Sequence, residues 1–330
     1  MEPRKTAIAG RRILVTGGAG FLGRAVTRKL RERGAKDLVI PRRAECDLSH
    51  WEHVERLFRR MRPELIVHLA ASVESPAGRG RIAESFRNNV LIALHLLEAA
   101  TQAGVEKVVL LGSASSYPAN ATTPLRESEL LGGLPEPPRV VHGIAKRLPL
   151  VAAQAWRQEY GLRSIFLVPT NCYGPDDNFD LESGYVIPSL VRKFVEAAES
   201  QAEEVTVRGT GCATRDFLHV EDCAEGIVLA LERYDGSQAV NLASGAETSI
   251  HDLARRIARL AGFIGRIRWD ANQPEGPMRR VLDATRAERE FGFRARRPLQ
   301  EGLAETVAWF RQTRGLHTTA EDSRAAASRG

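Results

Sequence analysis

His142 and Lys146 are the residues whose spacing first suggests chemistry in this chain. They lie four positions apart in the segment VVHGIAK, residues 140–146. A helix would place both side chains on one face, one turn apart. An imidazole can take up or release a proton near neutral pH, and a neighbouring ammonium group favours its neutral form. The pair therefore has the composition of an acid–base site on a helix.

A glycine-rich segment near the start of the chain has the spacing of a phosphate-binding loop. Gly17, Gly20 and Gly23 form G-x-x-G-x-x-G within ILVTGGAGFLG. The segment follows a predicted strand and opens a predicted helix, and in that context glycines let the backbone approach a pyrophosphate at a helix N-terminus. We therefore expect a bound nicotinamide dinucleotide.

The end of the second predicted strand favours NADP(H) over NAD(H). An acidic residue usually holds the ribose 2′-hydroxyl there, but this chain has Arg42 and Arg43. A guanidinium can bind phosphate through two parallel hydrogen bonds, which suits a 2′-phosphate. An arginine pair that is merely exposed on the surface is the alternative. Asp47 either accepts a hydrogen bond from the adenine amino group or caps the helix that follows.

Strands that alternate with long helices predict the fold that positions these residues. Short apolar runs are separated by longer helical patterns, and they occur at 12–17, 37–40, 64–70, 107–113 and 163–168. This alternation predicts an α/β fold with a doubly wound parallel sheet of the Rossmann type. Ligands are expected at the carboxyl ends of its strands.

The chain divides into two predicted domains and a tail. Residues 11–170 form a dinucleotide-binding domain, to which the chain returns near 217–245. After Pro169 turn-forming residues become frequent, and we assign 171–216 and 246–313 to a smaller C-terminal α/β substrate domain. The small and polar residues 314–330 predict a disordered tail.

Composition excludes several classes of protein. The 330 residues are 43% hydrophobic and 27% charged, as in ordinary globular proteins. No apolar run reaches the roughly 18 residues that span a membrane, and no signal peptide is recognisable, so we expect a cytoplasmic protein without a membrane partner. The four cysteines are widely spaced, so no metal site is expected. The net charge is +6, and basic doublets such as Arg59-Arg60 fall mostly within amphipathic helical stretches, so we expect no nucleic-acid partner.

Several longer stretches together resemble the extended short-chain dehydrogenase/reductases, and more specifically the GDP-L-fucose synthases among them. They are HLAAS (68–72), LGSASSYP (111–118), RESELLGG (126–133), PTNCYGP (169–175), YGPDDNF (173–179), VIPSLVRKF (186–194), TRDFLHVED (214–222) and RRVLDATR (279–286). The resemblance implies an NADP(H)-dependent enzyme whose substrate is a nucleotide sugar, such as a GDP-hexose or a 4-keto hexose. It also implies a homodimer in which helices 81–103 and 143–160 form a four-helix bundle.

The resemblance places five catalytic positions in this chain. In such enzymes serine, tyrosine and lysine serve proton transfer at the sugar C4 carbonyl, while a cysteine and a histidine epimerise C3 and C5. The serine corresponds to Ser113 and the lysine to Lys146. The other three positions differ, because His142 replaces the tyrosine, Ser115 the cysteine and Tyr185 the histidine.

These substitutions change the expected chemistry. The ordinary pKa is about 10 for tyrosine and about 6.5 for histidine, and Lys146 would lower the histidine value further. His142 should then be neutral at pH 7, which makes it a competent base and a poor proton donor for reduction of a ketone. Its ring is also shorter than a phenol, and a misplacement of about 1 Å can cost roughly a hundredfold in rate. The alternative is that His142 only fills the space left by the tyrosine.

The residues at the two epimerisation positions, Ser115 and Tyr185, indicate that epimerisation at C3 and C5 is lost. Ser115 needs a base of its own and otherwise is a simple loop hydroxyl, while Tyr185 either contacts the substrate or packs. Double epimerisation is therefore not expected. Two functions remain open. One is an NADP(H)-dependent oxidoreductase or epimerase with altered catalysis, whose reaction is C4 reduction or oxidation, or a step without net redox such as single-centre epimerisation or dehydration. The other is a dinucleotide-binding sensor or complex subunit without turnover.

The resemblance also assigns binding residues. For the cofactor it adds Phe21, Leu22, Leu48, Ala70, Ala71, Asn89, Lys146 and Pro169. For the substrate it assigns Asn171, Arg192, Lys193, Arg208, Arg215 and Arg279. Arg208 stands where these enzymes have a tryptophan near the base, so the nucleotide stays open.

Overall fold

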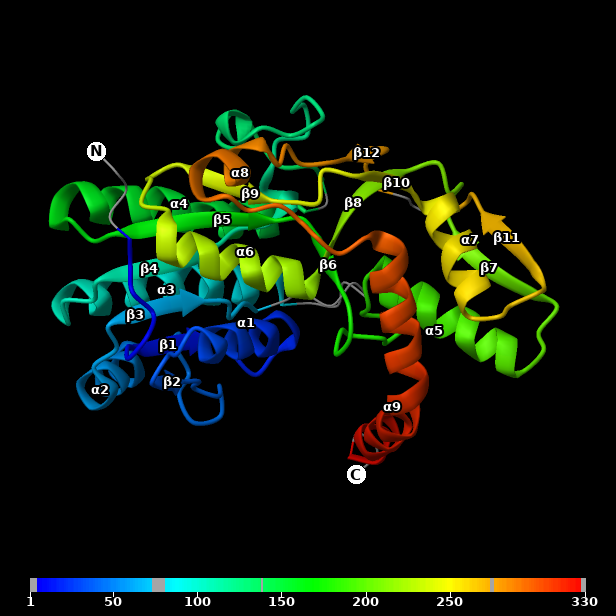
Figure 1. Cartoon of the computed structure of the whole chain (residues 1–330), viewed down its shortest axis with the longest axis horizontal. Coiled ribbons are helices and arrows are strands. Elements are labelled where there is room, and N and C mark those ends of the chain that lie inside the picture. The colour runs from blue at the N-terminus through cyan, green and yellow to red at the C-terminus, as the bar shows by residue number, and fades with distance from the viewer. Residues whose placement is uncertain (1–4, 73–80, 138, 274–275, 328–330) are drawn as a thin grey trace. The chain divides into compact units, whose positions relative to one another are not determined.

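The structure is a computed structural model that describes residues 5–72, 81–137, 139–273 and 276–327 (Figure 1). Its contacts divide the chain into two compact units. The first comprises Met1–Cys172, Asp216–Glu247 and Arg279–Arg296, and the second comprises Tyr173–Arg215, Thr248–Met278 and Arg297–Gly330.

Six parallel strands form the centre of the first unit. They are β1 (Arg12–Thr16), β2 (Asp37–Val39), β3 (Leu65–His68), β4 (Lys107–Leu111), β5 (Ser164–Pro169) and β9 (Ala239–Leu242), in the order β2-β1-β3-β4-β5-β9. The order runs outward from β1 in both directions, and ligands bind at the carboxyl ends of strands where such a reversal occurs. The predicted doubly wound parallel sheet of the Rossmann type is therefore confirmed.

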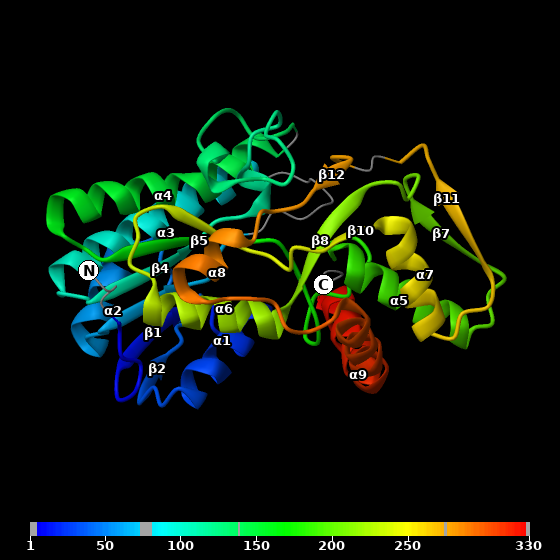
Figure 2. The ribbon, with the colours of Figure 1, turned by 45° about the horizontal axis from the view of Figure 1, so that its top comes forward.

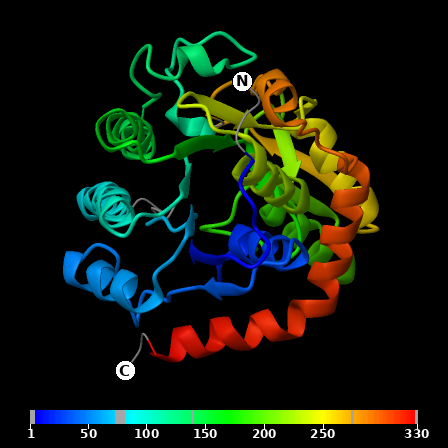
Figure 3. The same cartoon turned by 60° about the vertical axis from the view of Figure 1, so that its left-hand side comes forward.

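Helices cover both faces of this sheet. They are α1 (Phe21–Glu32), α2 (Trp51–Met61), α3 (Ile82–Gln102), α4 (Val140–Tyr160) and α6 (Val220–Arg233). Successive side chains of a strand point to opposite faces, so Ile13 packs with α1 and α6 while Leu14 packs with α2, α3 and α4. Figure 3 shows α2, α3 and α4 on one side of the sheet and α1 and α6 on the other. Burial on both faces explains why the strands are almost continuously apolar.

Residues 279–296 belong to the first unit, and their assignment to the substrate domain is wrong. This segment contains β12 (Arg279–Arg280) and α8 (Thr285–Phe291). Phe291 and Phe293 lie in the same core cluster as α1 and α6, and Leu282 forms a bridge with Leu125. The apolar residues of this segment predict burial, but their spacing does not reveal which core they enter.

The second unit contains a parallel strand pair and three helices (Figure 2). The strands are β7 (Glu204–Arg208) and β11 (Arg266–Asp270), and the helices are α5 (Val186–Glu199), α7 (Ile250–Leu260) and α9 (Leu299–Ala327). Phe179 stacks on Phe310 of α9, with ring centroids 4.7 Å apart. Short strands occur where the chain leaves or re-enters the units: β6 (Asn171–Tyr173), β8 (Thr214–His219) and β10 (Glu247–Ser249).

Helix α9 corrects the predicted disordered tail. The helix continues to Ala327, so residues 314–327 are helical, and 328–330 lie outside the described residues. Elongation of an existing helix adds one hydrogen bond for each residue fixed, and alanine is the strongest helix former. Within the described chain, no helix is both long and apolar enough to cross a membrane.

Candidate active site and cofactor pocket

The glycine loop between β1 and α1 is packed too closely for side chains. Gly17 has φ +71°, and a Cβ there would lie 2.7 Å from the Ala70 nitrogen. A Cβ on Gly23 would lie 2.0 Å from the Gly17 oxygen. Both positions therefore require glycine, and the backbone forms the close turn that a dinucleotide pyrophosphate needs at the start of α1.

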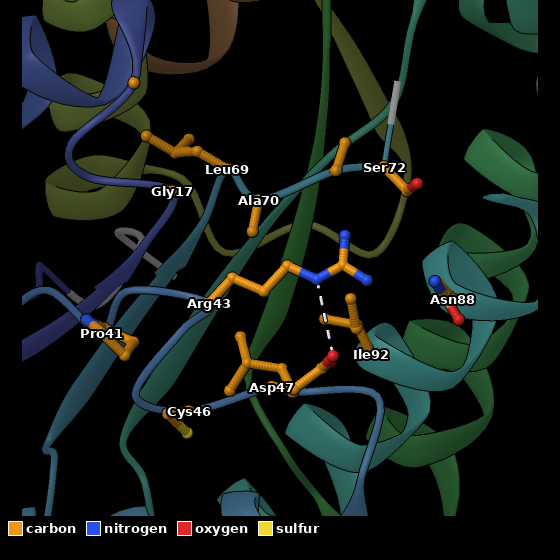
Figure 4. Close-up of a pocket in the computed structure, with 13 residues that line it drawn as sticks. Gly17, Pro41, Arg43, Cys46, Asp47, Leu69, Ala70, Ser72, Asn88 and Ile92 are labelled. Carbon is orange, nitrogen blue, oxygen red and sulfur yellow. Dashed lines mark ion pairs between the residues drawn. The ribbon is translucent and has the colours of Figure 1, made fainter. Parts of the chain in front are cut away.

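A pocket of about 320 Å³ lies at the carboxyl ends of β1, β2 and β3 (Figure 4). Predicted cofactor residues in its lining are Gly17, Gly20, Arg43, Asp47, Leu48, Ala70 and Ala71. Lining residues that were not predicted are Pro41, Cys46, Leu69, Ser72, Asn88 and Ile92. Leu69 directly follows β3, Ser72 lies in the segment after it, and Asn88 and Ile92 lie one turn apart on α3, so strand ends and helical spacing could have indicated them. The pocket has the size of a small-molecule site.

Arg43 and Asp47 face each other in this pocket. The Arg43 Nε lies 3.5 Å from an Asp47 carboxylate oxygen, and the arginine side chain extends across the pocket (Figure 4). The other carboxylate oxygen of Asp47 accepts hydrogen bonds from the Ser49 nitrogen at 3.0 Å and the Ser49 hydroxyl at 2.7 Å. Burial raises the pKa of Asp47, but the bonds from Ser49 and Arg43 outweigh it and hold that pKa below its ordinary value. Asp47 is thus an anion that orders the turn before α2.

Other predicted cofactor residues lie outside the lining of this pocket. Arg42 is exposed, while Phe21 and Leu22 open α1 and pack against the core. Asn89 accepts a hydrogen bond from the Ser72 nitrogen at 2.8 Å and donates one to the Ser72 oxygen at 2.9 Å. Asn89 therefore holds the segment after β3 in place. Pro169 is the last residue of β5.

His142 and Lys146 lie in the first turns of α4, as the spacing predicts. Burial, and then the positive charges of Lys146 and Arg139, lower the pKa of His142 to about 4. Burial lowers the pKa of Lys146 to about 8. At pH 7 the helix therefore presents a neutral imidazole beside a largely protonated amine, which is the state of a general base.

The serine loop, residues 113–117, follows β4 and contains the short helix η1 (Ala114–Ser116). The Ser113 and Ser115 hydroxyl oxygens lie 2.8 Å apart, and the Ser115 nitrogen donates to the Ser113 hydroxyl at 3.2 Å. Ser115 is buried and has no ionisable hydrogen-bond partner within the described ranges. Without a neighbouring base, a serine hydroxyl is not activated to remove a carbon-bound proton.

His68, which was not predicted from the sequence, is a buried histidine close enough to Lys146 to be affected by its charge. It ends β3, and its Nδ1 lies 2.6 Å from the Thr16 hydroxyl at the end of β1. Burial, and then the charge of Lys146, lower the pKa of His68 to about 3. A histidine among the apolar residues of a parallel strand, next to the strand's carboxyl end, is the signal that could have indicated it.

The predicted substrate residues of the second unit make contacts within that unit. Tyr185 precedes α5 and is 56% exposed. Arg192 pairs with Glu196 at 3.0 Å, and the Lys193 amine donates to the Thr206 oxygen at 3.2 Å. Burial, and then the charge of Arg208 on β7, lower the pKa of Lys193. Arg215, on β8, donates to the Thr214 oxygen at 2.7 Å.

Asn171 and Arg279 belong to the first unit. The Asn171 amide donates to the Asp216 carbonyl oxygen at 2.9 Å. Arg279 forms two parallel hydrogen bonds with the Glu247 carboxylate, at 2.8 and 2.7 Å. A phosphate would have to exchange with that carboxylate to bind Arg279. In the part of the chain that the structure describes, no group of three or more His, Cys, Asp or Glu side chains has an arrangement suited to a metal ion.

Known proteins resemble this chain along nearly its whole length. The model of the NAD dependent epimerase/dehydratase family matches residues 13–243. A probable GDP-L-fucose synthase 1 of Oryza sativa subsp. japonica is 37% identical over 313 residues, which are 94% of this chain and 95% of that protein.

Solved structures show the same fold. A GDP-L-fucose synthetase from Naegleria fowleri bound to NADP has a TM-score of 0.87 at 25% identity, covering 95% of this chain and 98% of its own. A GDP-mannoheptose C4 reductase from Campylobacter jejuni with NADP bound has a TM-score of 0.84 at 25% identity, covering 92% of this chain and 99% of its own. The chain therefore belongs to the NAD dependent epimerase/dehydratase family, and its resemblance to the GDP-L-fucose synthases extends over most of its length.

Proposed function

We propose that this protein is an NADP(H)-dependent oxidoreductase that acts at carbon 4 of a GDP-linked hexose or its 4-keto form. The observation that carries the proposal is the placement of His142 and Lys146 one turn apart on α4, in the unit that also contains the glycine loop; burial and the charge of Lys146 lower the pKa of His142. The relatives named as GDP-L-fucose synthases and the GDP-mannoheptose C4 reductase support this substrate class and this carbon.

His142 is the proposed proton acceptor at the carbon-4 hydroxyl. The nicotinamide ring supplies or accepts the hydride when the cofactor is bound. The low pKa of His142 keeps its imidazole neutral at pH 7, so it can take a proton during alcohol oxidation. Ser113 donates a hydrogen bond to the same sugar oxygen, and Lys146 holds the nicotinamide ribose, as in the enzymes that the chain resembles.

The proposed reaction does not include double epimerisation. Removal of a proton beside a ketone requires a base, and Ser115 is buried with its hydroxyl next to that of Ser113. Tyr185 remains available as a hydrogen-bond donor to the sugar. We assign the nucleotide diphosphate to Arg192, Lys193, Arg215 and Arg279, the base to the neighbourhood of Arg208, and a further substrate contact to Asn171.

The test of this function is hydride exchange in both directions. The protein is incubated with NADPH and GDP-4-keto-6-deoxymannose, and separately with NADP⁺ and GDP-hexoses that carry a free carbon-4 hydroxyl. The absorbance of reduced nicotinamide should change in at least one direction. Cofactor binding without turnover on any of these sugars would instead support a dinucleotide-binding sensor or complex subunit.

Arg43 is the proposed contact to the 2′-phosphate of NADP(H). The variant Arg43→Ala should raise the dissociation constant of NADPH by about tenfold, because one charge-assisted contact to phosphate is lost from a solvent-exposed position. The dissociation constant of NADH should change by less than about twofold, since NADH lacks that phosphate. Fluorescence titration with both cofactors measures the two values. Arg59→Ala, at an exposed arginine on α2, is the control, and an equal loss for both cofactors would contradict the assignment.

We also propose a homodimer in which α3 and α4 of two chains form a four-helix bundle. These helices pack side by side, and Leu148 and Val151 of α4 remain exposed apolar residues. The double variant Leu148→Glu/Val151→Glu should be a monomer in light scattering, because charges would replace the apolar contact. Ile264→Glu, at an exposed apolar residue of the second unit, should leave the dimer intact. A monomeric wild-type protein would contradict this proposal.

A further inference from the structure

Gly143 follows His142 in α4. Because glycine has no side chain, the loop at Pro135 and the serine loop at Ser115 can both pack closely against α4 at this position. A Cβ at Gly143 would lie 2.6 Å from Pro135 Cγ and 2.7 Å from the Ser115 carbonyl oxygen. One of these atoms is part of a ring and the other is backbone, so neither can move aside as a flexible chain end would. Alanine is the better helix former, yet at this position it would push the serine loop away from α4.

Arg147 lies one turn after Gly143, on the same face of α4. It is 7% exposed, and its hydrogen bonds in the described chain all go to backbone carbonyls. The Nε donates to the Ser116 oxygen at 3.1 Å, Nη2 donates to the same oxygen, and Nη1 donates to the Gly133 oxygen at 2.6 Å. A buried guanidinium without a carboxylate is costly, and burial lowers the pKa of Arg147. The Arg147 side chain thereby connects two loops, at Ser116 and at Gly133, to α4.

These two residues act on the segment that contains the catalytic hydroxyl. Gly143 contacts the loop at Ser115 and Arg147 binds it at Ser116, while Ser113 lies in hydrogen-bond contact with Ser115. The position of Ser113 relative to His142 therefore depends on how closely the serine loop packs on α4. An imidazole is shorter than a phenol, so a histidine at this position needs a closer approach of the opposing groups than a tyrosine does.

We propose that Gly143 and Arg147 are positioning residues that hold the serine loop against α4 closely enough for His142 to work with Ser113. The inference rests on the proposed function, because it assumes that His142 and Ser113 share one sugar oxygen. It assigns a positioning role to Gly143 and Arg147, which have no proposed contact with sugar or cofactor. It also predicts that the loss of turnover on changing them depends on which residue occupies position 142.

A double-mutant cycle tests this dependence. Gly143→Ala should lower kcat for alcohol oxidation, which uses neutral His142, by about tenfold or more in the wild-type background, since a displacement near 1 Å is expensive. The same change should cost less than about threefold when combined with His142→Tyr, because the longer phenol still reaches the substrate. Equal losses in the two backgrounds would overturn the proposal, since a purely structural defect does not depend on residue 142.

Arg147 allows a test with a matched control. Arg147→Met should lower kcat for alcohol oxidation by about tenfold, with the dissociation constant of NADPH almost unchanged. Arg147→Lys should restore part of the loss by donating to one carbonyl. Arg157→Met is the control, because Arg157 is another arginine of α4, partly buried, that binds the Ser164 backbone oxygen and the Asp235 carboxylate, away from the serine loop. Equal kcat for Arg147→Met and Arg157→Met at equal stability would overturn the proposal.

An NMR titration of His142 distinguishes a failure of this inference from a failure of the proposed function. Burial is the largest cause of the low pKa of His142, and the charges that act on it come from Lys146 and Arg139. A loosened serine loop admits water, so Gly143→Ala and Arg147→Met should raise that pKa by about one unit or more, whether or not the protein turns over a sugar. An unchanged pKa in both folded variants would show that these residues do not control the surroundings of His142.

Discussion

The variant His142→Tyr is expected to reduce a 4-keto nucleotide sugar at pH 7 roughly a hundred times faster than the wild-type protein. With a pKa of about 4, His142 carries a proton in only about one molecule in a thousand at pH 7. A tyrosine hydroxyl is protonated in nearly every molecule at that pH, so the variant regains a proton donor. NADPH consumption with GDP-4-keto-6-deoxymannose measures the effect.

Ketone reduction and alcohol oxidation by the wild-type protein should depend on pH in opposite ways. Ketone reduction by the wild-type protein needs protonated His142, so its rate should fall about tenfold per unit as pH rises above about 4. Alcohol oxidation needs the neutral form, so it should rise through pH 4 and remain level until Lys146 deprotonates near pH 8. His142→Phe removes both activities and serves as control. A wild-type reduction rate that is flat between pH 5 and pH 8 would contradict His142 as the proton donor.

The variant Lys146→Met should lower turnover by roughly a hundredfold or more in both directions, because the amine beside the base and the nicotinamide ribose is lost. It should also raise the pKa of His142, since a neighbouring positive charge is removed. Burial is the larger cause of the low pKa of His142, and it persists in this variant. The pKa of His142 should therefore stay below the ordinary value of about 6.5. Turnover and an NMR titration of His142 measure the two effects.

Arg139→Met is the matched control for this prediction. Arg139 is exposed just before α4, and its charge also lowers the pKa of His142. The variant should therefore raise that pKa but retain most of the turnover in alcohol oxidation at pH 7, since His142 stays neutral there and Arg139 has no proposed contact with sugar or cofactor. Lys146→Met with wild-type turnover would exclude a catalytic use of the pair on α4.

The parallel sheet and the glycine loop could be predicted because their determinants are local. Buried strands need continuous apolar runs, and the turn at Gly17 needs a residue that tolerates positive φ. His142 and Lys146 share a helix, so their spacing alone places them together. These features need no knowledge of how distant segments pack.

Other features depend on contacts between distant segments. Phe291 and Phe293 read as apolar residues of the later part of the chain, but they fill the core beneath α1 and α6. Arg147 reads as an ordinary surface arginine until Gly133 and Ser116 are found opposite it. Its position one turn after a glycine, on the buried face of α4, was the only local indication. The pairing of Arg279 with Glu247 likewise joins β12 to β10 and has no signature in either segment.

The transfer of deuterium from the nicotinamide to the sugar tests the central claim most directly. The protein is incubated in ordinary water with NADPH deuterated at the reactive position of the ring and GDP-4-keto-6-deoxymannose, at about pH 5, where reduction should be faster than at neutral pH. The product should contain deuterium at carbon 4. The same reaction with ordinary NADPH in heavy water should leave carbons 3 and 5 unlabelled. Cofactor binding with no deuterium at carbon 4, in the wild-type protein and in His142→Tyr alike, would contradict an oxidoreductase.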